Sequence, residues 1–163
     1  MTPNALNVTF EESAVGDTFS GRLSVNLWHL MTGAALYGDM SANHVDVEHS
    51  TKNRFGGRVI HGFTIAGMMS GLVTRRYNWA LEGLLESNTR FLAPIFVDNN
   101  LDVRWQVIAK TPKPSFGGGL MDLGGAAWVG RERRKVVQMT IKIGLSNYRG
   151  PEIESNGSST PPL

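Results

Sequence analysis

Two side chains that can exchange protons, Asp39 and His44, stand five residues apart in a polar stretch of the chain. A carboxylate and an imidazole on a loop can hold one water molecule between them and act on it as general base and general acid. The alternative is structural, with Asp39 as a helix-terminating turn residue and His44 as a surface or buried histidine, because isolated pairs of this kind are common. Since coupled groups titrate together, we treat the pair as one unit.

A second group of candidate residues begins at His61 and Gly62, which open an apolar segment. If a helix starts at Gly62, its unpaired N–H groups and the positive end of its dipole suit a developing oxyanion. The alternative is that Gly62 only permits the turn into the helix, and the two roles are compatible. Ser70 lies eight residues on, about two turns along the same helix. There it either lines the site or is hydrogen-bonded within the helix.

A helix is predicted immediately before the pair, because apolar residues recur with helical spacing from 27 to 34. Ser24 or Asn26 is available as its N-cap, and Gly38 follows as its terminator. This helix therefore delivers Asp39 just past its C-terminal end.

The two groups of candidate residues are separated by residues 40–60, which predict a long loop with one short turn of helix. Apolar periods are few there, and several Asn and Gly residues interrupt the stretch. Loops of this length are often functional. Residues 62–75 form the next predicted helix, which is apolar on nearly all sides and is therefore expected to be buried.

The remaining elements are predicted to be β-strands. Alternation of apolar and polar residues predicts strands at 17–24, 85–91, 101–107, 121–129 and 137–145. Short connections make such strands antiparallel, and the apolar helix is the element able to cover their apolar face. The predicted fold class is α+β, a single domain in which an antiparallel β-sheet wraps around one long central apolar helix.

The candidate residues together resemble the signature of the MaoC-like dehydratases, the (R)-specific enoyl-CoA hydratases of the hot-dog fold. That signature runs G-D-x-N-P-x-H and then H-G-M-x-x-x-S-x-x-S, and the chain has GDMSANH followed by HGFTIAGMMS. The residues that coincide with it without a gap are Gly38, Asp39, His44, His61, Gly62 and Ser70. The resemblance extends more loosely to about residue 145. We therefore expect a MaoC-like hot-dog domain over residues 1–148 and a disordered C-terminal tail over 149–163.

The resemblance implies an enzyme that hydrates trans-2-enoyl-CoA thioesters to (R)-3-hydroxyacyl-CoA, or that runs the reverse dehydration. It implies that Asp39 and His44 activate the water, that Gly62 and Ser70 bind the substrate or its oxyanion, and that His61 is structural. Coenzyme A is then part of the substrate, and no separate cofactor is expected. The fold also implies a homodimer or higher homo-oligomer, for which an exposed edge strand gives a route.

The chain departs from the family pattern beside the pair. Ser41 and Ala42 replace Asn-Pro, and Asn43 stands where an apolar residue is usual. Because proline stiffens a loop, Ala42 predicts a less rigid one. Ser41 is a shorter substitute for the asparagine, and Asn43 is expected to add a polar contact in the substrate site. Two other functions therefore stay open, a hot-dog acyl-CoA thioesterase and a non-catalytic acyl-CoA-binding partner subunit, because a fold alone does not settle function.

Composition argues against several other classes of function. The 163-residue chain has no cysteine and a net charge of +2, so disulfides are excluded and a reducing, cytoplasmic location is expected. No signal peptide or membrane-spanning segment is predicted. No metal site is expected, because no pair of histidines shows ligand spacing. A basic cluster at residues 131–135 lacks interleaved aromatic residues, which predicts a hairpin turn facing water rather than a nucleic-acid site.

Overall fold

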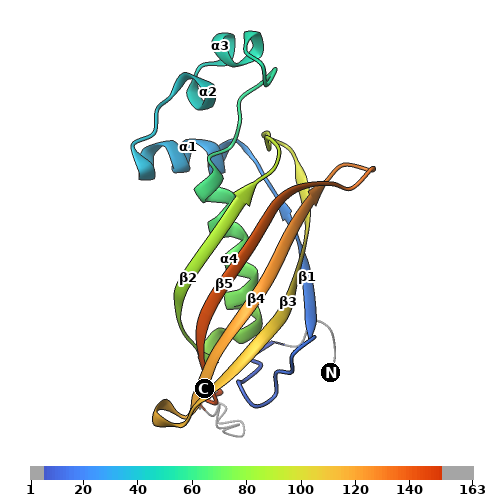
Figure 1. Cartoon of the computed structure of the whole chain (residues 1–163). Helices are drawn as coiled ribbons and strands as arrows, with labels where there is room; N and C mark the ends of the chain where they lie inside the picture. The colour runs from blue at the N-terminus through green and yellow to red at the C-terminus, as the bar shows by residue number, and fades with distance from the viewer. Residues whose placement is uncertain (1–5, 152–163) are drawn as a thin grey trace, which may run out of the picture.

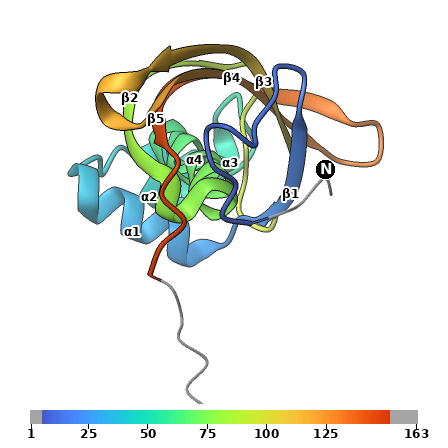
Figure 2. The same cartoon turned by 90° about the horizontal axis from the view of Figure 1, so that it is seen from below.

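The fold is organised around α4 (Gly62–Tyr77), a helix that lies in the concave face of a five-stranded antiparallel sheet (Figure 1). The computed structural model describes residues 6–151. Seen from below in Figure 2, the sheet curls over α4. The predicted α+β arrangement, one long helix wrapped by an antiparallel sheet, is confirmed.

The strands are β1 (Thr18–Ser24), β2 (Leu81–Phe91), β3 (Asn100–Lys113), β4 (Gly118–Val129) and β5 (Arg134–Ser146). They lie in the order β1-β3-β4-β5-β2, and each neighbouring pair is antiparallel. All five predicted strands are therefore present, with β1 and β2 at the two edges of the sheet. Two 3₁₀ helices flank strands, η1 (Asn78–Ala80) before β2 and η2 (Pro114–Phe116) between β3 and β4.

The core lies between the sheet and one side of α4. Alternate residues of β3 and β5 point into it, as their period of two predicts, and they are buried: Leu101, Val103, Trp105, Val107, Val137, Met139, Ile141, Ile143 and Leu145. The helix contributes Ile65, Met69 and Val73. The indole N–H of Trp105 donates to the carbonyl oxygen of Met69 at 3.2 Å, so a hydrogen bond joins sheet and helix. Burial of each large apolar side chain stabilises the fold by about 1.5–3 kcal/mol.

The opposite side of α4 is exposed, which corrects the prediction of a helix covered all round. Phe63 is 76% exposed, and Gly67 and Gly71 have open space where a side chain would stand. The sheet covers one side of α4 only. The apolar composition of this helix therefore predicted more burial than a single chain provides. Strand β2 shares this exposure, because Leu84 and Leu85 are 52% and 57% exposed.

Three helices precede α4 and carry several of the candidate residues: α1 (Leu27–Tyr37), α2 (Ala42–Val45) and α3 (Val47–Lys52). They form the upper part of the molecule in Figure 1. Helix α1 begins at Asn26, whose side chain accepts from the N–H of His29 at 3.2 Å. It ends at Gly38, which adopts a left-handed φ of 67° that glycine enters without strain. The predicted end of this helix is therefore confirmed.

The stretch 40–60 contains two short helices, α2 and α3, where one turn was predicted. Asp46 separates them, and its carboxylate accepts from the N–H of His49 at 2.8 Å, which caps α3. An aspartate at this position is an N-cap signal. The prediction missed it because it relied on apolar periodicity, which is weak in helices of four and six residues.

The C-terminal segment returns to the N-terminal segment. The guanidinium of Arg149, the first residue of the predicted tail, lies 2.5 Å from a carboxylate oxygen of Glu12. Residues 152–163, the rest of that predicted tail, lie outside the described residues. Within residues 6–151, no helix is both long enough and apolar enough to cross a membrane.

Candidate active site

The candidate catalytic pair meets between the end of α1 and α2. Asp39 follows the C-cap glycine of α1, and His44 lies in α2. The distance between Oδ2 of Asp39 and Nε2 of His44 is 3.5 Å. This is too long for a hydrogen bond, but a water molecule about 2.8 Å from each atom can form a triangle with them. The structure therefore brings the two predicted residues together at a separation that one water molecule can bridge.

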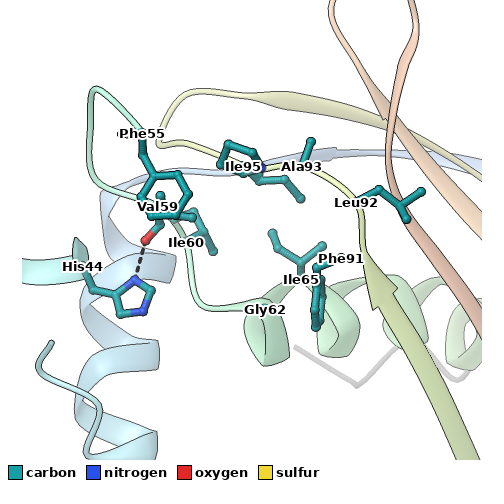
Figure 3. A pocket seen from close by; sticks show the side chains of 11 residues that line it. His44, Phe55, Val59, Ile60, Gly62, Ile65, Phe91, Leu92, Ala93 and Ile95 are labelled. Carbon is teal, nitrogen blue, oxygen red and sulfur yellow. Dashed lines mark hydrogen bonds between the residues drawn. The ribbon is translucent and has the colours of Figure 1, made fainter. Parts of the chain in front are cut away.

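A backbone carbonyl fixes the orientation of His44. Its Nδ1 lies 2.6 Å from the carbonyl oxygen of Val59 (Figure 3). Because a carbonyl oxygen only accepts, the proton of the neutral ring stands on Nδ1, and Nε2 keeps a lone pair on the side of Asp39. The N–H of Val59 donates to the carbonyl oxygen of Asn43 at 3.1 Å, so two hydrogen bonds hold α2 to this segment. The imidazole is thus oriented to exchange a proton at Nε2.

Asp39 is held ionised by Ser41, the residue that replaces asparagine in the family pattern. The backbone N–H of Ser41 donates to Oδ1 of Asp39 at 3.2 Å. This bond, followed by the Ser41 hydroxyl, lowers the pKa of Asp39 below its ordinary value of 3.8, and the two nearby imidazoles contribute less. The Asp39 side chain is 48% exposed, so solvent screens the imidazole charges. Ser41 therefore acts on the carboxylate of the pair.

His61, for which a structural role was predicted, is the third member of this cluster. Its side chain is 3% exposed, and Nε2 donates to the carbonyl oxygen of Asp39 at 3.0 Å. Its ring stacks on that of His44 with 3.8 Å between ring centres and 27° between planes. His61 therefore positions both members of the pair, one by a hydrogen bond and the other by ring contact.

The three side chains also raise the question of a metal site. The ligand atoms of Asp39, His44 and His61 all lie within 4.8 Å of one another. Metal-binding side chains can therefore converge here although no pair of histidines shows ligand spacing in the sequence, so spacing alone was not a sufficient reason to expect no metal site. The stacked rings nevertheless disfavour shared coordination, because nearly parallel planes do not direct two lone pairs to one ion about 2 Å from each nitrogen. The Nε2 proton of His61 is also engaged by the Asp39 carbonyl. The cluster fits proton transfer better than metal binding.

An apolar cavity of about 400 Å³ lies beside His44 (Figure 3). Its lining is His44, Phe55, Val59, Ile60, Gly62, Ile65, Phe91, Leu92, Ala93, Pro94 and Ile95. The wall of the cavity is therefore formed by segments that precede α4 in the sequence, by the start of α4, and by the end of β2 with the segment that follows it. The sequence motif indicates His44 and Gly62 but not residues 91–95, because nothing in a strand and the turn after it shows which cavity these residues will line. A mostly apolar cavity of this size is typical of a small-molecule site.

Gly62 lies at the first position of α4 and lines the cavity. The first N–H groups of a helix have no acceptor within it, and they carry the positive end of the dipole. A Cβ atom at this position would stand 2.7 Å from the ring of Phe91. A side chain at this position would therefore have to displace the half-exposed Phe91 ring, and glycine leaves the backbone open to a ligand, so the two roles of Gly62 are compatible.

Two other predicted site residues lie away from the cavity lining. The hydroxyl of Ser70 donates to the carbonyl oxygen of Ala66 at 3.0 Å, one turn back in α4. The amide oxygen of Asn43 accepts from Nδ2 of Asn53 at 2.7 Å, which joins α2 to the end of α3. The Ser70 hydroxyl is thus bonded within its helix, and Asn43 supports the local fold through its bond to Asn53. The predicted substrate contacts of both residues stay predictions.

The part of the chain that forms this site matches a known domain family. The family model described as "MaoC like domain" matches residues 19–115, which is more than half of the chain. No curated protein matches the chain significantly in sequence.

Solved structures share the fold at low sequence identity. The R-hydratase PhaJ1 from Pseudomonas aeruginosa is 20% identical, with 98% of this chain and 97% of that chain covered and a TM-score of 0.78. The (R)-hydratase from A. caviae involved in PHA biosynthesis is 18% identical, with coverages of 83% and 98% and a TM-score of 0.71. The ChsH1-ChsH2 complex from Mycobacterium tuberculosis is 16% identical, with coverages of 82% and 98% and a TM-score of 0.69. The predicted hot-dog fold is confirmed, and the chain belongs to the MaoC-like dehydratase family.

Proposed function

We propose that the chain is an enzyme that adds water to trans-2-enoyl-CoA thioesters to give (R)-3-hydroxyacyl-CoA, or that runs the reverse dehydration. The observation that carries the proposal is the 3.5 Å separation between Oδ2 of Asp39 and Nε2 of His44, beside an apolar cavity that also reaches Gly62. An ionised carboxylate and an imidazole with a free Nε2 can act as the base that takes a proton from water, and the protonated pair can then act as the acid that this reaction needs. Membership of the family supports the same class of reaction.

In the forward direction, the Asp39–His44 pair takes a proton from the water that it binds. The water oxygen then bonds to C3 of the enoyl group. The electrons of the C2–C3 double bond move toward the thioester carbonyl, which gives an enolate with negative charge on oxygen. We assign the first N–H groups of α4, at Gly62, to the stabilisation of that oxygen. C2 finally takes a proton from the pair, which returns to its starting state.

The test is hydration of crotonyl-CoA, followed by loss of the ultraviolet absorbance of its conjugated thioester. Asp39→Asn and His44→Ala are each expected to lower kcat at least 100-fold, since a positioned acid or base contributes about 10²–10⁴-fold. His49→Ala is the matched control, because His49 is an exposed histidine on α3. Full activity in both site variants would falsify the proposal.

Two further readouts separate the rival functions. Release of free thiol from acyl-CoA without loss of the double bond would indicate a thioesterase. Tight binding of crotonyl-CoA with no turnover would indicate a non-catalytic subunit. The stereochemistry is tested by coupling to dehydrogenases of known preference, and oxidation of the product only by an (S)-specific enzyme would contradict the (R) assignment.

We also assign the uncovered side of α4 and strand β2 to a homodimer interface. Phe63, Leu84 and Leu85 are each more than half exposed, and large apolar side chains left uncovered on neighbouring elements suit an interaction site. Strand β2 is at the edge of the sheet, where its unpaired side can accept a second strand. Phe91 is 48% exposed and also lines the cavity, so a second copy docked here would lie next to the acyl site.

A further inference from the structure

A basic turn between β4 and β5 has no part in the site described above. Arg131, Arg133, Arg134 and Lys135 are all exposed there. Among the residues that the structure describes, none of these four forms an ion pair with a carboxylate. With Glu132, the turn carries a net charge of +3, whereas the whole chain carries +2. The positive balance of the protein is therefore concentrated in this turn.

An aromatic ring lies among these cations, which corrects the sequence-based view that the cluster lacks aromatic residues. Trp128 is opposite Asp102 of β3 and Lys135 of β5 in the sheet register. The guanidinium carbon of Arg133 lies 5.6 Å, and the ammonium of Lys135 5.8 Å, from the centre of the indole. The carboxylate of Asp102 is paired with Arg22 at 3.1 Å, so the local charge stays positive. The prediction missed Trp128 because this residue precedes the turn in the sequence. It comes close to Arg133 and Lys135 only because β4 pairs with β5.

Two hollows flank the indole on the outer face of the sheet. One has a volume of about 440 Å³ and includes Arg133, and the other has about 310 Å³ and includes Lys135. Arg104 and Trp128 line both hollows, and Ala126 leaves room in the second. Volumes of roughly 300 Å³ and above are typical of small-molecule sites. The surface therefore offers a stacking platform, several cations and space for one nucleotide.

This outer surface is close to the wall of the cavity. The N–H of Leu92, a lining residue, donates to the carbonyl oxygen of Val136 at 2.8 Å, and the faint orange β4–β5 hairpin is drawn near Leu92 in Figure 3. Val136 follows Lys135, which pairs with Trp128. Leu92 and Trp128 are therefore about two strand spacings apart, roughly 10 Å. The pantetheine arm of coenzyme A is longer than this separation.

We propose that Trp128 and the surrounding cations bind the 3′-phospho-ADP end of coenzyme A while the acyl chain occupies the cavity. The adenine stacks on the indole, and Arg104, Arg133 and Lys135 pair with the phosphates. This assignment rests on the proposed function for its substrate. An acidic carrier protein would also be attracted to the charge, but it would not use a half-buried indole beside a nucleotide-sized hollow. The geometry therefore favours the nucleotide.

The test compares crotonyl-CoA with crotonyl-pantetheine, which lacks the nucleotide. Trp128→Ala is expected to raise KM for crotonyl-CoA about tenfold, since base stacking on an aromatic side chain contributes about 1–3 kcal/mol. It is expected to leave kcat/KM for crotonyl-pantetheine unchanged. The double variant Arg133→Ala with Lys135→Ala is expected to raise KM for crotonyl-CoA and to weaken its salt dependence. Trp128→Phe keeps a stacking surface and should restore most of the affinity.

Lys113→Ala is the matched control, because Lys113 is an exposed lysine at the far end of β3. Calorimetric titration with adenosine 3′,5′-bisphosphate measures the site without turnover. Binding that Trp128→Ala removes supports the site even if no hydration occurs, so the two proposals fail separately. Absence of binding, or equal KM for crotonyl-CoA and crotonyl-pantetheine in the wild type, would overturn the assignment. A preference for a crotonylated carrier protein over crotonyl-CoA would do the same.

Discussion

His61 connects the two members of the candidate pair. It donates a hydrogen bond to the backbone of Asp39, 22 residues earlier, and stacks against the ring of His44. The sequence indicated that Asp39 and His44 belong together, because both lie in one short motif. It could not show that His61 reaches them, because that contact depends on how α1 and α4 pack. A role of this kind follows from tertiary structure and not from spacing.

We predict that His61→Phe lowers kcat about tenfold with a small change in KM. Phenylalanine keeps the ring contact with His44 but lacks the N–H that holds the Asp39 carbonyl, and one hydrogen bond contributes about 1 kcal/mol. His61→Gln provides an amide donor and should recover part of the loss. Steady-state kinetics on crotonyl-CoA is the measurement. Equal kcat in the phenylalanine variant and the wild type would show that the bond has no role in positioning.

A second prediction at this scale concerns the charge of Asp39. Its pKa is lowered in the folded protein, so its contribution to stability is present above its ordinary value of 3.8 and is lost as pH falls through the lower folded pKa. Ser41→Ala removes the hydroxyl and should move the pKa of Asp39 upward, so protonation begins at a higher pH. Titration of the carboxyl carbon by NMR measures this directly. Ser87→Ala, an exposed serine on β2, is the control, and an unchanged Asp39 titration in Ser41→Ala would exclude the hydroxyl as a cause.

At the scale of elements, the backbone at the start of α2 bears on the replacement of proline by Ala42. Ala42 was expected to loosen the segment because the family pattern has proline there. Ser41 is extended, with φ −60° and ψ 146°, and Ala42 is the first residue of α2. These are the conformations that a proline at position 42 would require of itself and of its neighbour. The backbone is therefore already arranged as the family pattern would arrange it.

We therefore predict that Ala42→Pro stabilises the protein by about 0.4–1 kcal/mol, because it restricts the unfolded chain without straining the folded one. Asn43→Pro is the control, since it would place a proline after helical Ala42 and should destabilise α2. Denaturant unfolding with equal m-values measures both changes. A loss of stability in Ala42→Pro would mean that α2 begins elsewhere in solution.

Long elements were predicted better than short ones. Buried residues alternate with less buried ones from Leu101 to Val107 in β3 and from Val137 to Ile143 in β5, and the matching sequence pattern predicted both strands and their inward faces. Helices α2 and α3 are too short to show a period and are held by caps and by the hydrogen bonds of Asn43 and Val59. The exposed faces of β2 and α4 were misjudged because a sequence pattern does not distinguish burial within one chain from burial between chains.

At the scale of the whole molecule, the uncovered apolar face predicts assembly. Leu85→Glu is expected to shift the protein from dimer to monomer, because a stable interface of about 800 Å² per partner does not tolerate a buried unpaired charge. Light scattering after size-exclusion chromatography measures the mass. Val15→Glu is the control, since Val15 is similarly exposed at 61% in the N-terminal segment. A wild-type protein that is monomeric at micromolar concentration would contradict the assignment.

The contact between Phe91 and Gly62 has a further consequence. The ring lines the cavity and also stands where any side chain at position 62 would have to go. Under the proposed function, chain-length selectivity and alignment of the thioester carbonyl would therefore be linked through the packing of Phe91 against Gly62. A variant that shortens residue 91 admits a bulkier acyl group and at the same time frees the start of α4 to shift, so broader specificity is gained together with poorer polarisation of the carbonyl.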